Sequence, residues 1–116
     1  MSNLAVRVVP EPLRSLAYTS FGGSSYVGVG SPLQNPCHSY KWNNNTDVDL
    51  FLSWDGINDH EFMPAKSGFV YDIASNKSEP AGTLHIAQFT RFYVREVSAA
   101  ATTGSVYITI YYGFNG

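Results

Sequence analysis

Apolar and polar side chains alternate along several stretches of this chain, and this alternation restricts the possible folds more than any other feature. In residues 105–112, for example, Val106 and Ile108 fall on one side, while the residues between them fall on the other. Successive side chains of an extended strand point to opposite faces, so the pattern is typical of a strand with one buried face. The same alternation occurs in residues 47–54 and 91–97. No long stretch repeats its apolar positions with the spacing of a helix, and the sequence therefore predicts an all-β fold.

Shorter stretches that are rich in β-branched and aromatic residues predict further strands. These stretches are residues 13–21, 25–29, 37–42, 68–73 and 83–89. Gly, Pro, Asn, Asp and Ser cluster between them, as expected for turns, and Gly22-Gly23 between the first two predicts a hairpin. Seven or eight short strands at this spacing predict two packed antiparallel sheets, that is, an antiparallel β-sandwich or jelly-roll-like fold.

The N-terminal residues differ from the rest of the chain. The stretch LAVRVV is strand-like, but Pro10 and Pro12 follow it, and proline interrupts the hydrogen bonding of a strand. Either this segment is an arm that pairs with the sheet edge of a neighbouring subunit, or it is the edge strand of its own domain. We therefore divide the chain into residues 1–12, an N-terminal arm or edge strand, and residues 13–116, a single β-sandwich domain. The arm interpretation predicts subunit contacts at four apolar residues: Leu4, Val6, Val8 and Val9.

Charged residues make up 14% of the chain and aromatic residues 15%. Typical soluble domains carry about 25% charged residues, so few charges are available here to keep the surface hydrated. Either uncharged polar residues cover the surface, or part of it is buried against other molecules. This balance favours a homo-oligomer or a subunit of a larger assembly.

The distribution of charge and of apolar residues argues against two classes of partner. The net charge is −2, and the seven Lys and Arg residues are scattered, so we expect no nucleic-acid partner. The longest apolar run is too short to span a bilayer, so we expect no membrane partner. Cys37 is the single cysteine, which excludes an internal disulfide, and the N-terminal residues lack the pattern of a signal peptide. We therefore expect a protein that is made in a reducing cytoplasm.

Three acidic residues and a histidine cluster after the alternating strand of residues 47–54: Asp55, Asp59, His60 and Glu61. Such a group could bind a metal ion or act in acid–base catalysis. However, the spacing does not match a calcium loop, and His60 has no second His or Cys at zinc-binding spacing. Asp55-Gly56, directly after the strand, is instead a strong signal for a tight turn. We interpret the cluster as the tip of a β-hairpin, with a metal or acid–base site as the alternative.

Other residue types with reactive side chains give no catalytic pattern. Three histidines lie on three different predicted elements: His38, His60 and His85. Cys37 is interpreted as a partly buried thiol at the start of a strand rather than a redox residue. The run Gly28-Val29-Gly30 lacks the further residues of a phosphate-binding motif and is interpreted as a bulge or a close approach of two backbones. No catalytic, metal-binding or cofactor-binding residue is predicted, and we expect the chain not to be an enzyme.

Five aromatic residues could have either of two roles: Trp42, Trp54, Tyr107, Tyr111 and Tyr112. They could form the core and the subunit contacts of a β domain, where Tyr and Trp are favoured. They could instead stack on sugar rings, as in a carbohydrate-binding sandwich. We expect core and subunit contacts, and the sugar-binding platform is the alternative.

Short groups of polar turn residues and aromatic strand residues follow one another between residues 45 and 113. They are Asn45-Thr46-Asp47; Ser53-Trp54-Asp55-Gly56 with Asp59; Pro64 and Ser67; Phe92-Tyr93-Val94-Arg95; and Gly104-Ser105-Val106-Tyr107 with Tyr111-Tyr112-Gly113. In these residues the chain resembles the small virion structural proteins of tailed bacteriophages. The resemblance implies a β-sandwich subunit that is repeated around the head or neck of the virion and has no catalytic activity. It implies no functional residue, and it does not extend to the first 44 residues.

We therefore expect a non-enzymatic virion structural protein of a tailed phage, without a cofactor, that is assembled in the host cytoplasm. It would bind the capsid exterior as a decoration or cement protein, or it would lie at the head–tail neck. Its partners would be further copies of itself and the major capsid protein or neck and portal components. The alternative is a carbohydrate-binding or adhesion module of a tail fibre or baseplate, with a glycan as its ligand.

Overall fold

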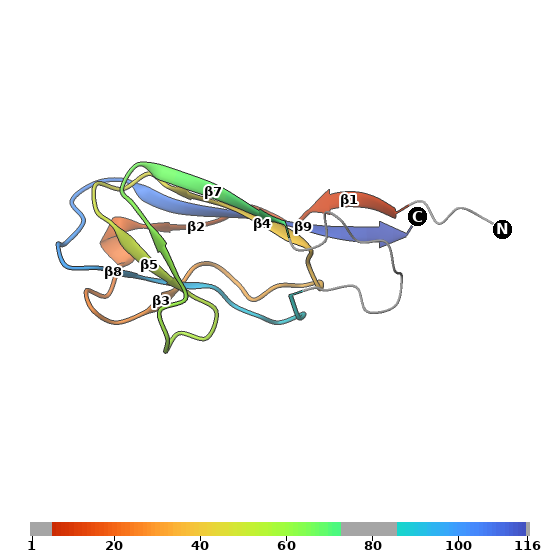
Figure 1. Ribbon diagram of the computed structural model, residues 1–116, viewed down its shortest axis with the longest axis horizontal. Helices are drawn as coiled ribbons and strands as arrows, with labels where there is room; N and C mark the ends of the chain where they lie inside the picture. Colours follow the sequence, from red (N-terminus) through yellow and green to blue (C-terminus); the bar gives the residue numbers. More distant parts are fainter. Residues whose placement is uncertain (1–5, 73–85, 116) are drawn as a thin grey trace.

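The computed structural model describes residues 6–72 and 86–115. These residues form two antiparallel sheets, which lie one above the other in Figure 1. The larger sheet has the strand order β1-β9-β4-β7, with β2 also paired to β9, and the smaller sheet has the order β3-β8-β5-β6. The prediction of an all-β antiparallel sandwich is confirmed. The described residues form nine strands rather than seven or eight.

The strands are short, apart from β9. The larger sheet contains β1 (Val6–Pro10), β2 (Arg14–Ala17), β4 (Ser39–Asn44), β7 (Ser67–Asp72) and β9 (Ser105–Asn115). The smaller sheet contains β3 (Val27–Gly28), β5 (Leu50–Ser53), β6 (Glu61–Met63) and β8 (Tyr93–Glu96). Within the described ranges the one helical element is a 3-10 turn, η1 (Tyr18–Ser20), and no helix there could cross a membrane.

The core fills the space between the sheets with every second side chain of the strands. In β4, Tyr40 and Trp42 are buried, whereas Lys41 and Asn43 between and beside them are exposed. The inward-facing residues of β9 are Val106, Ile108 and Ile110, and those of β5 and β8 are Leu50, Leu52 and Val94. Burying one large apolar side chain stabilises the fold by about 1.5–3 kcal/mol. A slip of one residue would expose the whole set, so the alternation that predicts these strands also fixes their register.

The buried amide of Asn44 ties the two sheets together near β6. Its Nδ2 donates to the carbonyl oxygens of Val48 (3.0 Å), Met63 (3.3 Å) and Pro64 (3.1 Å). Its Oδ1 accepts hydrogen bonds from the backbone amide (3.0 Å) and the hydroxyl (2.6 Å) of Thr46. Both ends of the amide are therefore satisfied, and the side chain fixes the end of β6 against β4.

Gly22 and Gly23 form a tight turn, as predicted, but the turn does not close a hairpin. Gly23 has a φ of 67°, and the amide of Ser25 donates to the carbonyl of Gly22 at 3.1 Å. The strands on either side belong to different sheets, because β2 pairs with β9 and β3 pairs with β8. The hairpin prediction is wrong because turn residues set only the local reversal, whereas the other strands of each sheet set the pairing.

The predicted strand at residues 83–89 is wrong in the part that the structure describes, and residues 83–85 lie outside that part. Ile86 forms only an isolated bridge with Cys37. Phe89 has a φ of 73°, in the left-handed region that a strand does not use. Conversely, β6 was not predicted, because its three residues are too few to show an alternating pattern.

Candidate functional site

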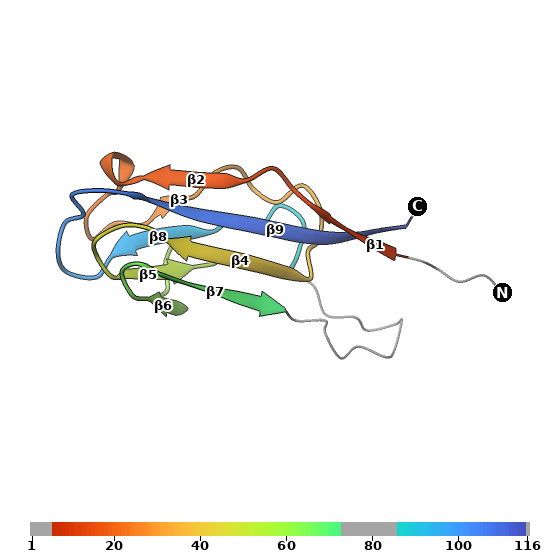
Figure 2. The same cartoon turned by 90° about the horizontal axis from the view of Figure 1, so that it is seen from above.

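The first strand forms a two-stranded ribbon with the end of the chain. β1 pairs antiparallel with β9, from Val6 opposite Asn115 to Pro10 opposite Tyr111. β4 pairs with β9 only as far as Tyr111. Beyond that residue, β1 is the one strand beside β9 in the described part of the chain, and the two strands run past the sandwich together (Figures 1 and 2).

This pairing matches the edge-strand interpretation of the N-terminal residues, because β1 lies on β9 of its own chain. Val6, Val8 and Val9 lie in β1, whereas Leu4 lies outside the described residues. Three of the four predicted contact residues therefore lie on a ribbon that protrudes from the sandwich. Their contact with another subunit stays a prediction.

A β-bulge separates the ribbon from the sandwich. Pro10 pairs with Tyr111, and the next paired residue, Arg14, lies opposite Ile108. Residues 11–13 thus oppose only residues 109 and 110, so the N-terminal side carries one residue more than β9. A bulge of this kind bends the strand and increases its twist. The two prolines predicted that the strand is interrupted here, and the structure has a β-bulge at this point.

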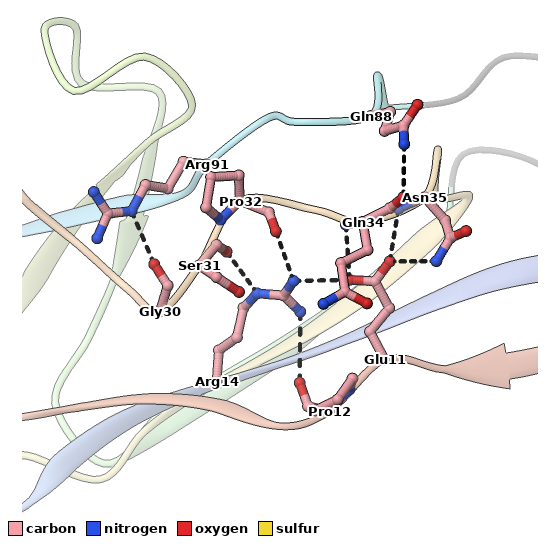
Figure 3. A network of polar contacts seen from close by, with 10 residues as sticks. All are labelled: Glu11, Pro12, Arg14, Gly30, Ser31, Pro32, Gln34, Asn35, Gln88 and Arg91. Atoms are coloured by element: carbon pink, nitrogen blue, oxygen red, sulfur yellow. Dashed lines mark hydrogen bonds and ion pairs between the residues drawn. The ribbon is translucent and has the colours of Figure 1, made fainter.

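A buried ion pair holds the bulge against the loop of residues 31–35 (Figure 3). Arg14 Nη2 lies 2.8 Å from Glu11 Oε1, and the two side chains are only 5% and 1% exposed. The other carboxylate oxygen of Glu11 accepts hydrogen bonds from the amide and the side-chain Nδ2 of Asn35, both at 2.9 Å. Arg14 donates to the carbonyls of Ser31 (2.8 Å) and Pro32 (3.0 Å). A buried charge pair is tolerated only with such complete hydrogen bonding, so the network specifies where the first strand turns away from the sandwich.

Two glycines leave room for arginine side chains beside this network. A Cβ atom added to Gly30, which has a φ of 70°, would lie 2.7 Å from Arg14 Cγ. A Cβ atom added to Gly28 would lie 2.3 Å from Arg91 Cζ, and Arg91 Nε donates to the carbonyl of Gly30 at 2.8 Å (Figure 3). The glycine run was interpreted as a bulge or a contact between two backbones. The contact between two backbones is wrong, because the nearest atoms at both glycines belong to the side chains of two arginines.

The environment of Glu11 lowers the pKa of its carboxyl group. Burial raises this pKa, but the hydrogen bonds from Asn35, Arg14 and Gln34 outweigh the burial and bring it below the ordinary value of 4.5. A folded-state pKa below the unfolded one means that the charged form stabilises the fold. This stabilisation is fully present above pH 4.5 and is lost as the pH falls through the lower folded pKa.

The substitution Glu11→Gln should therefore make the stability of the protein less sensitive to acid. At neutral pH the variant should be less stable than the unmodified chain, because Arg14 loses its charged partner. The difference in free energy of unfolding should shrink as the pH falls from 7 towards 3, and urea denaturation at several pH values measures it. A difference that stays constant over this range would show that Glu11 is not ionised in the folded chain.

The acidic cluster forms the tip of a hairpin, as predicted. β5 pairs antiparallel with β6, and residues 54–60 connect them. The carboxylate of Asp55 accepts hydrogen bonds from the amides of Ile57 (2.8 Å) and Asn58 (2.9 Å) and from the hydroxyl of Ser53 (2.8 Å). These backbone donors, Asn58 first, hold the pKa of Asp55 below its usual range. The carboxylate therefore organises the loop.

Asp59 faces a different direction from Asp55 and contacts the outer face of the smaller sheet. Arg95 donates to both of its oxygens, at 3.1 and 2.8 Å, and the hydroxyl of Tyr26 donates to Oδ1. The guanidinium of Arg95 also lies over the ring of Phe51, 4.7 Å from its centroid. The hydrogen bond from Arg95 lowers the pKa of Asp59. This group is a solvent-exposed ion pair beside an aromatic ring. Exposed ion pairs add little to stability.

Glu61 contacts a third set of residues. Its Oε2 accepts hydrogen bonds from the hydroxyl of Tyr40 (2.7 Å) and from Nε1 of Trp54 (3.2 Å). Burial, followed by this hydrogen bond, raises the pKa of Tyr40, so the hydroxyl stays protonated and donates. His60 Nδ1 accepts from the backbone amide of Trp54 at 3.0 Å. The three carboxylates of the cluster are thus directed to separate partners.

The described ranges contain no group of three or more His, Cys, Asp and Glu side chains arranged to hold a metal ion. Among the other candidates, His85 lies outside those ranges, and His38 donates its backbone amide to the carbonyl of Tyr111 at 3.2 Å. Cys37 is fully buried, which raises the pKa of its thiol to about 12. The thiol therefore stays protonated at neutral pH. It is fully rather than partly buried, and it lies two residues before β4.

The aromatic residues divide between the core and the surface. Trp42 is 1% exposed and packs against Tyr40 and Phe92, so it cannot form a binding platform. Trp54 is only partly buried, and it faces the exposed ring of Tyr71. Trp54 was predicted to have one of two roles, whereas Tyr71 was not among the candidate residues. Tyr71 is near the end of β7, on the side of the strand that faces the smaller sheet. Its exposure depends on how closely the two sheets pack there, which the sequence does not show.

The Glu11–Arg14 network was also missed. The only sequence signal was an acidic and a basic residue three positions apart beside two prolines, in a chain with few charges. No known protein family, no curated protein and no solved structure matches this chain.

Proposed function

We propose that the chain is a non-enzymatic structural subunit of a tailed-phage virion. It assembles with further copies of itself on the capsid exterior, as a decoration protein, or at the head–tail neck. Its other partners are the major capsid protein or neck and portal components. The resemblance of residues 45–113 to small virion structural proteins suggests the setting, and the β1–β9 ribbon supports the mode of assembly.

The ribbon is the observation that carries the proposal. Two strands alone are at best marginally stable in water, because they leave backbone groups unpaired on both outer edges. In the described part of the chain, β9 has no strand other than β1 beside it after Tyr111. A strand or sheet edge from a neighbouring subunit would pair these edges by strand addition. The bulge at residues 11–13 fixes the base of the ribbon and so directs it towards that neighbour.

The order of the strands supports the finer assignment of a jelly roll. Without β1, each sheet contains four strands, β2-β9-β4-β7 and β3-β8-β5-β6. Strands β2, β3, β4 and β5 alternate between the sheets, as do β6, β7, β8 and β9. A jelly roll has eight strands in two Greek keys, and viral capsid proteins and lectins both use it. The fold alone does not distinguish a capsid protein from a lectin. The proposal of a virion structural protein therefore rests on the ribbon and on the resemblance.

Particles of a phage whose genome encodes this chain provide the test. After purification on a density gradient, the particles should contain the chain at a fixed ratio to the major capsid protein, measured by quantitative mass spectrometry. Each copy that bridges neighbouring subunits binds only the assembled state, so many copies stabilise it by mass action. If the chain is found only in the fractions without particles, the proposed function is wrong.

A further inference from the structure

A hollow of about 480 Å³ lies where the β5–β6 hairpin meets β7, and Trp54, His60, Glu61 and Tyr71 line it. Sites for small ligands have volumes in this range and combine apolar walls with a few polar groups. β6 is the last strand of the smaller sheet and β7 is the last strand of the larger one. The hollow therefore bridges the two sheets, and its residues come from both.

Two aromatic rings form walls of the hollow at an angle to each other. The ring centroids of Trp54 and Tyr71 are 6.4 Å apart, and the ring planes are inclined by 59°. The ring of Trp54 is held from behind by edge contacts with Tyr40 (6.1 Å) and Phe92 (5.8 Å). Tyr71 is 42% exposed. The walls thus offer a fixed ring and a second, accessible ring to a ligand.

The same hollow offers one hydrogen-bond acceptor and one donor. Oε2 of Glu61 is held by Tyr40 and Trp54, whereas Oε1 has no hydrogen-bond partner within the described residues and can accept from a ligand. Nδ1 of His60 accepts from a backbone amide, so the neutral ring carries its proton on Nε2. The nearest carboxylate oxygen, Oδ2 of Asp55, is 4.0 Å from this Nε2. Nε2 can therefore donate to a ligand.

We propose that this hollow binds a neutral pyranose sugar, either free or as the exposed end of a polysaccharide. A hydroxyl group both donates and accepts, so vicinal hydroxyls match Glu61 Oε1 and His60 Nε2 together. The apolar C–H face of a pyranose matches the aromatic walls. An alkylammonium ion would accept no hydrogen bond from His60, and an acidic sugar would meet the charge of Glu61. The proposal is independent of the proposed assembly function, because none of these residues belongs to the ribbon.

Titration of the purified protein with methyl glycosides tests the proposal. We expect saturable binding of one or more of methyl β-glucopyranoside, methyl β-galactopyranoside and methyl α-mannopyranoside. The binding should change the fluorescence of Trp54, since the other tryptophan, Trp42, is buried in the core. Immobilised neutral oligosaccharides form the second arm, which detects a site that requires a longer chain. Either form of binding supports the proposal. No binding in either arm, or binding only of choline or of sialic and uronic acids, overturns it.

Substitutions locate the binding. Tyr71→Ala removes an exposed wall and should weaken binding about 10-fold, and Glu61→Gln should weaken it by a similar factor while keeping an acceptor for Tyr40 and Trp54. Phe62→Ala is the matched control, because Phe62 is 51% exposed on β6 but does not line the hollow. Circular dichroism checks that each variant is folded. Binding that is unchanged in Tyr71→Ala and Glu61→Gln, or lost in Phe62→Ala, places the ligand elsewhere and overturns the proposal.

Discussion

Removal of residues 2–9 is expected to leave the chain folded but unable to assemble, so that its oligomer falls to a monomer in sedimentation velocity. The deletion removes all four predicted contact residues together with most of β1. It retains Glu11, so the buried ion pair with Arg14 stays intact. The buried core residues that the structure describes lie between Val29 and Ile110. The melting temperature should therefore fall by less than about 5 °C, the change that roughly 1 kcal/mol causes in a domain of this size.

A shorter deletion is the control for this prediction. Removing only Ser2 and Asn3 retains Leu4, Val6, Val8 and Val9 and should leave assembly unchanged. If the chain without residues 2–9 assembles like the unmodified chain, assembly does not depend on the ribbon. If it fails to fold, the ribbon is part of the domain's own stability, and the arm interpretation is wrong.

The substitution Glu11→Ala is expected to have the largest effect on stability of any change to a charged residue. It leaves Arg14, which is only 5% exposed, without the one acidic partner that it has in the described part of the chain. Removing one partner of a buried ion pair costs about 3–5 kcal/mol, which is a large part of the roughly 5–15 kcal/mol that stabilises a typical domain. Urea denaturation, followed by tryptophan fluorescence, measures the loss in free energy of unfolding.

Two further variants show whether the loss comes from an uncompensated charge. The double substitution Glu11→Ala with Arg14→Leu removes both charges and should recover part of the stability. Asp59→Ala breaks the exposed pair with Arg95 and should have a much smaller effect than Glu11→Ala. Equal losses in Glu11→Ala and Asp59→Ala would contradict the description of the Glu11 network as the buried anchor of the first strand.

The sequence predicted those parts of the fold that depend on local alternation. Residues 47–54 and 105–112 alternate because one face of β5 and of β9 is buried. β5 lies within the first stretch, and β9 covers the whole of the second. The hairpin tip was predictable for a similar reason, since Asp55-Gly56 carries its turn chemistry in adjacent residues. The pairing of β2 with β9 was not predictable, because it joins residues such as Arg14 and Ile108 that are far apart along the chain.

The candidate sites were less predictable than the strands, because they depend on contacts between residues that are far apart along the chain. Glu11 and Arg14 are close in sequence, but the loop of residues 31–35 is what buries them. Tyr71 lies in β7 of the larger sheet and Trp54 directly follows β5 of the smaller one, so no spacing in the sequence brings them together. The N-terminal strand was recognised as separate because its prolines are a local signal. Which strand it pairs with is decided by the end of β9, at the other end of the chain.

Amide hydrogen exchange of the intact chain, compared between a concentrated and a diluted solution, tests the central claim most directly. Assembly through the ribbon predicts that the amides of residues 6–9 and 112–115 are protected at high concentration and lose this protection on dilution. The amides of β4, which lie inside the sandwich, should exchange at the same rate in both solutions. Ribbon amides whose exchange does not depend on concentration would contradict the account, as would a change confined to the other strands.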